Sequence, residues 1–116
     1  MLKHLILAVT LAAPLPALAQ DDGHEGHMMG DKSPASMAFM EANDRMHQAM
    51  MMEYTGNADV DFVKGMIAHH KGAVEMAQIV LEHGTDPEVK KLAEEIIKAQ
   101  EGEIKWMEEW LAKNGG

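Results

Sequence analysis

The stretch DVDFVKGMIAHHKGAVEMAQIVLEHG, Asp59–Gly84, decides the fold. Its apolar residues recur at intervals of three and four, which is the pattern of an amphipathic helix. Asn57 or Asp59 can cap the start of this helix, and we expect it to run to about His83. Gly84 stands where a left-handed residue commonly ends a helix.

A further helix is predicted on each side of this stretch. Ser33 followed by Pro34 is a cap-then-proline start, and the first helix is expected from Pro34 to about Tyr54, with a break at Gly56-Asn57. Asp86-Pro87 repeats the start signal, so the third helix is expected from Pro87 to about Lys113. The apolar stripe of this third helix comprises Val89, Leu92, Ile96, Ala99, Ile104, Met107 and Leu111, widened by Trp106 and Trp110.

The expected fold is therefore all-α. Short connections between long helices force antiparallel neighbours, so the sequence predicts an up-down bundle of three main helices. Three helices enclose only a thin core, and a homodimer that completes a larger bundle is a further expectation.

The N-terminal residues are expected to lie outside this fold. A short basic start, an apolar run over residues 5–15 and Ala17-Leu18-Ala19 are typical of a secretory signal peptide, residues 1–19, cleaved after Ala19. The apolar run has about half of the ~20 residues that a membrane anchor needs. We expect a periplasmic or secreted protein, not embedded in a membrane, with a flexible tail at residues 20–32 and a helical domain at 33–116.

Composition restricts the function. The net charge of −9 is unsuited to holding nucleic acid, whose phosphates need Lys and Arg. The chain has no cysteine, which removes thiolate metal sites, and neither Ser33 nor Ser36 stands in a glycine-framed nucleophile elbow, so no enzyme is predicted. It has 12 methionines, far above ordinary usage, and any soft-metal chemistry must use their thioether sulfur.

Methionine and histidine share helix faces. At about 100° per residue, Met66, His69 and Met76 fall on one face of the second helix, with His70 at its edge. On the first helix Met46, His47 and Met50 are neighbours. If the two helices form a hairpin, these faces can meet around an ion. Thioether sulfur favours soft ions such as Cu(I) and Ag(I), and imidazole suits copper in both oxidation states.

Packing is the competing interpretation, because methionine commonly fills cores. The first helix, however, contains no Leu, Ile or Val between Pro34 and Tyr54, and a core built only for packing would use them. A second candidate metal site lies in the tail, where a solvated linker is the equal alternative; its donors are His24, His27, Met28 and Met29.

Three segments resemble the DUF305 family: residues 59–84, RMHQAMM at 45–51 and AQEGEIKWMEEWL at 99–111. The resemblance covers about residues 36–113 and implies a ferritin-like helical fold. Some members are exported copper-binding proteins with roles in copper resistance. The resemblance therefore implies metal roles at the matching positions, which are Met46, His47, Met50, Met66, His69, His70 and Met76. A di-iron oxidase site does not follow, since no glutamate has a histidine three residues later.

The leading hypothesis is an exported copper-binding protein, for Cu(I) or Cu(II) and also silver, that serves copper tolerance or passes the ion to a transfer partner. The alternative is a methionine-rich protein-interaction module without a metal function.

Overall fold

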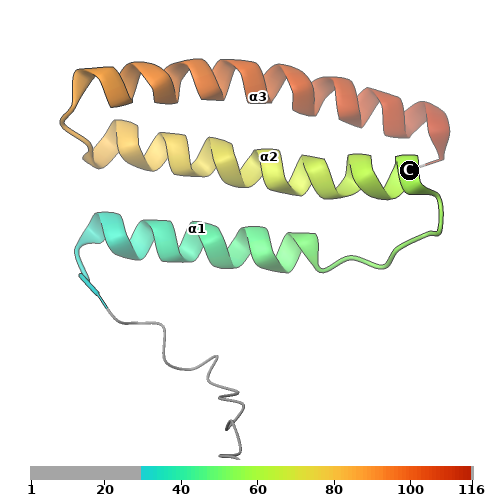
Figure 1. Cartoon of the computed structure of the whole chain (residues 1–116), viewed down its shortest axis with the longest axis horizontal. Helices are drawn as coiled ribbons and strands as arrows, with labels where there is room; N and C mark the ends of the chain where they lie inside the picture. Colours follow the sequence, from blue (N-terminus) through green and yellow to red (C-terminus); the bar gives the residue numbers. More distant parts are fainter. Residues whose placement is uncertain (1–29, 116) are drawn as a thin grey trace, which may run out of the picture.

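The computed structural model describes residues 30–115, and these form three antiparallel helices (Figure 1). They are α1 (Pro34–Met50), α2 (Ala58–His83) and α3 (Pro87–Asn114). The predicted all-α, three-helix architecture is confirmed. The proposed signal peptide, residues 1–19, and most of the proposed tail lie outside the described residues. No described helix combines the length and apolarity needed to cross a membrane.

The three helix starts follow the capping signals of the sequence. The Ser33 hydroxyl accepts a hydrogen bond from the Ser36 N–H, with Pro34 in the first helical position. The Asn57 side chain accepts from the N–H groups of Asp59 and Val60, so Asn57, and not Asp59, is the cap of α2. Asp86 caps α3 in the same way. These local bonds satisfy N–H groups that have no partner within a helix.

Two helix ends differ from the prediction. α1 stops at Met50 and not near Tyr54, because the following chain is held by α2: the Asp61 carboxylate accepts from the Thr55 N–H at 2.9 Å and from the Gly56 N–H at 3.2 Å. Gly84 is extended (φ −77°, ψ 161°) and not left-handed, since the chain leads directly from it to the cap of α3. A left-handed glycine instead ends α3, where Gly115 is the C-terminal cap.

Helix α2 lies between the other two (Figure 1). It packs against α1 on one flank and α3 on the other, whereas no Cα atom of α1 lies within 8 Å of one in α3. Within the described residues the buried apolar side chains are mostly small; they are Ala42, Val60, Val63, Val74, Ala77, Ala93 and Met107. The core is therefore thin, and it is divided between two seams, one on each flank of α2.

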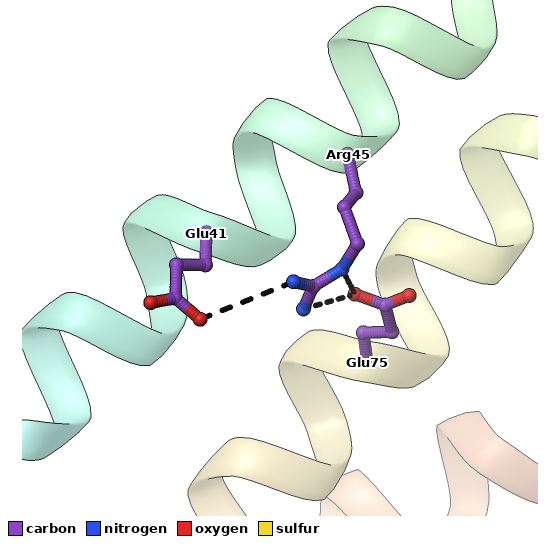
Figure 2. A network of polar contacts seen from close by, with 3 residues as sticks. All are labelled: Glu41, Arg45 and Glu75. Carbon is purple, nitrogen blue, oxygen red and sulfur yellow. Dashed lines mark hydrogen bonds and ion pairs between the residues drawn. The ribbon is translucent and has the colours of Figure 1, made fainter.

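The α1–α2 seam depends on a close approach at Gly72. A β-carbon at this position would lie 2.5 Å from Met46 Sδ and 2.8 Å from Met46 Cγ, so the thioether occupies the space that a side chain would need. An ion pair lies beside this contact: the Arg45 guanidinium donates to Glu75 at 3.0 and 3.1 Å and approaches Glu41 at 4.0 Å (Figure 2). These contacts fix how α1 is aligned along α2.

We expect Gly72→Ala to lower the free energy of unfolding by up to about 2 kcal/mol. Overpacking against Met46 costs about 1–3 kcal/mol, which exceeds the ~1 kcal/mol that alanine gains over glycine within a helix. Urea unfolding measures the change. Gly102→Ala is the matched control, because no atom lies within 4 Å of the added carbon, and it should stabilise the protein by about 0.5–1 kcal/mol. Equal effects of the two substitutions would contradict the close packing.

The hydrogen bonds that Asp61 accepts from the α1–α2 loop also predict that the stability of the protein falls at acidic pH. Hydrogen bonding from the Thr55 N–H, supported by the Thr55 hydroxyl and the Gly56 N–H, lowers the pKa of Asp61. A lowered folded pKa contributes stability above the unfolded value of about 3.9, and this is lost as the pH falls through the folded pKa. Asp61→Asn should therefore reduce stability at pH 6 and weaken its fall below about pH 4. Asp59→Asn, which touches none of these loop bonds, is the control; if it weakens the fall at acidic pH equally, Asp61 is not the cause.

Candidate functional site

The methionine and histidine side chains predicted to bind metal are divided between the two flanks of α2. In the antiparallel α1–α2 pair, one turn forward along α1 is one turn back along α2. Met46 lies against Gly72, so Met50 comes opposite Ala68, beside His69. A small cavity lined by Met46, Ala49, Ala68 and Gly72, among others, agrees with this alignment. The α1–α2 seam thus holds Met46, whereas Met50 and His69 do not line this cavity and are both exposed.

These three donors differ in their access to solvent. Met46 is partly buried in the seam, Met50 is 39% exposed, and His69 is exposed. His47 is also exposed, on the outer side of the last turn of α1. A soft ion arriving from solvent would therefore meet histidine nitrogen and the Met50 sulfur first, with Met46 deeper between the helices. Such a gradient suits capture and release by exchange of one ligand at a time.

The face of α2 that carries Met66, with His70 at its edge, was expected to meet α1; Met66 and His70 instead lie against α3. Adjacent helical residues diverge by about 100°, and His70 turns toward α3 while His69 stays on the open side of α2. His70 Nε2 lies 2.5 Å from Glu103 Oε2, and the His70 side chain is only 12% exposed. Met66 lines the same cavity as His70, together with Glu103 and Met107 of α3.

Met76 lies in a third environment. It is 47% exposed and lines an apolar groove of about 320 Å³. All three helices contribute to this groove; its other residues are Phe39, Ala73, Ala77, Val80, Val89, Leu92, Ala93 and Ile96. Val89 and Leu92, expected in the core, are 44% and 54% exposed here, because the flat arrangement of helices leaves this face open. Met76 is thus separated from the histidines by side chains that carry no metal donor.

Two side chains of the α2–α3 seam were not assigned a site role from the sequence. Met107 appeared only as a core residue, and Glu103 was not singled out. They stand four apart on α3, on the side that faces α2, and this spacing is the signal that could have found them. His24, His27, Met28 and Met29 lie outside the described residues. Among residues 30–115 no three His, Asp or Glu side chains gather into a group suited to a metal ion.

Comparison with known proteins adds the family. The model of a family described as a domain of unknown function, DUF305, matches residues 1–112. An uncharacterized protein of Acanthamoeba polyphaga mimivirus is 39% identical over 49 residues, which is 42% of this chain. The alignment spans about a third of the viral protein's length (32%). Neither description names an activity, a ligand or a partner.

The two adjacent histidines should differ in their contribution to the metal-free fold. His70→Ala removes a packed side chain from the α2–α3 seam and should cost about 1–2 kcal/mol, whereas His69→Ala changes an exposed residue and should stay within about 0.5 kcal/mol. Urea unfolding in the presence of a chelator gives both values. Equal losses for the two variants would mean that His70 is not packed against α3.

Proposed function

We propose that this chain, which belongs to the DUF305 family, is an exported copper-binding protein that holds the ion with methionine sulfur and histidine nitrogen. Its role would be copper tolerance or trafficking, with release to a partner protein by ligand exchange. Export is proposed from the signal-peptide pattern of residues 1–19. The proposed donors are Met46, His47 and Met50 of α1 and Met66, His69, His70 and Met76 of α2, with His24, His27, Met28 and Met29 as a further capture site.

The observation that carries the proposal is the alignment of α1 with α2. The contact between Met46 and Gly72 supports a donor set at this seam that would consist of the Met46 and Met50 sulfurs and the exposed His69 imidazole. Thioether and imidazole are both neutral, so a monovalent ion adds only its own charge to the seam. This set of donors suits Cu(I), and by the same chemistry Ag(I), better than it suits Ca²⁺ or Mg²⁺, which prefer oxygen ligands.

The charges around the seam are compatible with a bound cation. Two cationic side chains line the cavity at this seam, and both are paired: Arg45 with Glu75 and Glu41 (Figure 2), and Lys71 with Glu108. The chain as a whole is acidic, with a net charge of −9, and this weakly favours cations near the surface. Neither feature selects copper; the selection comes from sulfur.

The open groove favours a second candidate function, association with another copy of the chain. Its lining is apolar, and the half-exposed Met76, Val89 and Leu92 would be covered by a second layer of helices. A methionine-rich surface is adaptable enough for such packing. This is the interaction-module alternative, and it requires no metal.

The purified, untagged chain should bind Cu(I), kept reduced, and Ag(I) more tightly than equal concentrations of free methionine and histidine do. Met46→Leu/Met50→Leu should weaken binding by about tenfold or more at an unchanged helical content, since leucine conserves volume but not sulfur. Met37→Leu, about half a turn around α1 from Met46, is the matched control and should bind as the unsubstituted chain does. Competition titration and native mass spectrometry report affinity and stoichiometry.

Binding no tighter than that of the free amino acids would contradict the proposal. If the chain then also self-associates in sedimentation equilibrium, regardless of metal or chelator, the interaction-module function replaces it.

A further inference from the structure

The α2–α3 seam holds a square of four side chains. Met66 and His70 stand one turn apart on α2, and Glu103 and Met107 stand one turn apart on α3. Because the helices are antiparallel and His70 meets Glu103, Met66 comes opposite Met107. All four line one cavity of about 250 Å³, which Phe62 and Trp106 complete. The square lies on the flank of α2 away from α1.

The hydrogen bond to Glu103 defines the tautomer of His70. An ionised carboxylate can only accept a hydrogen bond, so His70 Nε2 must be the donor. In the neutral imidazole the proton is then on Nε2, and Nδ1 carries the lone pair. Glu103 is mostly exposed and reaches back over the seam, whereas His70 is almost covered. The carboxylate therefore orients a ring that lies deeper than itself.

His70 Nδ1 has no hydrogen-bond partner. The atom is buried, and no donor among residues 30–115 reaches it. A buried acceptor without a partner is unfavourable, and such atoms are rare enough in folded proteins to need an explanation. The methionines of the square cannot supply a hydrogen bond, since a thioether has no proton to donate. A cation, in contrast, can use the Nδ1 lone pair and the sulfur lone pairs together.

We propose that Met66, His70 through Nδ1, and Met107 bind one soft monovalent cation in the α2–α3 seam, with Glu103 as the residue that positions the imidazole. The inference rests on the proposed copper-binding function and adds a second site, distinct from the α1–α2 seam, with Met107 as a ligand. Two thioethers and an imidazole match the preference of Cu(I).

Glu103 completes this arrangement without touching the ion. A histidine that ligates a metal commonly donates its other N–H to a carboxylate, which fixes the ring and makes the ligating nitrogen more basic. Here the Glu103 carboxylate would also place one negative charge on the opposite side of the His70 imidazole from the cation. Phe62 and Trp106 line the mouth of this cavity and are mostly exposed, at 64% and 58%. An ion can therefore enter between them.

The test uses the full chain, Ag(I) as the redox-stable probe, and the ring nitrogens of ¹⁵N-labelled histidine. Without metal, long-range ¹H–¹⁵N spectra should show His70 with its proton on Nε2. Addition of Ag(I) should move the Nδ1 resonance of His70 and leave Nε2 protonated. A shift at Nε2 in place of Nδ1 would overturn the inference, because Glu103 would then have to release the ring.

Substitutions separate ligation from structural support. Met107→Leu conserves volume and should weaken Ag(I) binding at His70 about tenfold or more, while Met37→Leu should not. Glu103→Ala should mix the His70 tautomers and weaken binding 10–100-fold, the usual effect of losing such a partner. Glu103→Gln should restore most of this loss, because the amide oxygen accepts the same hydrogen bond. Unchanged binding at His70 in Met107→Leu would remove Met107 from the site.

The outcomes also distinguish this inference from the function on which it rests. A chain that binds neither Cu(I) nor Ag(I) fails both. A chain that binds Ag(I) through Met46 and Met50, but whose His70 resonances do not respond to saturating metal, retains the proposed function and contradicts only the α2–α3 site.

Discussion

The middle position of α2 is the constraint on which the rest of the structure depends. A helix that packs against a neighbour on each side must have two flanks whose side chains are complementary to those neighbours. Its remaining faces are not constrained by this packing. On one flank Gly72 admits the Met46 thioether, and on the other His70 meets Glu103. The histidine pair at 69–70 straddles this division, since two successive residues cannot point the same way on a helix. The α2–α3 seam thus receives His70, whereas His69 stays exposed on the open side of α2.

The same constraint explains why the protein has only a thin hydrophobic core. Because the backbones of α1 and α3 stay apart, residues 30–115 enclose no deep common core, and mostly small side chains are buried in the two seams. Most of the polar contacts between helices lie at the surface, such as Lys71 with Glu108 at 3.4 Å, and exposed pairs of this kind add little stability. An ion held between two helices would add stability that grows with the logarithm of its concentration relative to Kd, to the extent that it binds the folded state more tightly than the unfolded chain. Metal binding at a seam would therefore stabilise the packing of the two helices that form it.

Features that depend on residues close together in the sequence could be predicted, whereas features that depend on how the helices meet could not. The three helix starts were predictable, because Ser33, Asn57 and Asp86 act on N–H groups within three residues of themselves. The end of α1 was not, since it depends on Thr55 and Asp61, which meet only when the loop folds back onto α2. Helix periodicity placed the donors on faces but could not say which helix each face would meet.

The candidate site shows the same limit. That His69 and His70 diverge follows from the helix itself, whereas the partnership of His70 with Glu103, 33 residues away, follows from the alignment of α2 with α3. Met107 looked like core for the same reason: its burial is real, and its nearness to Met66 appears only when the two helices are aligned.

X-ray absorption spectroscopy of the Cu(I)-loaded chain tests the central claim most directly, because it reports the elements bound to copper without assuming which residues supply them. With no cysteine in the chain, any protein sulfur bound to copper must come from methionine. The account predicts a first shell of mixed sulfur and nitrogen. A shell of nitrogen and oxygen alone would contradict it, since the thioethers of both seams would then serve only to fill space.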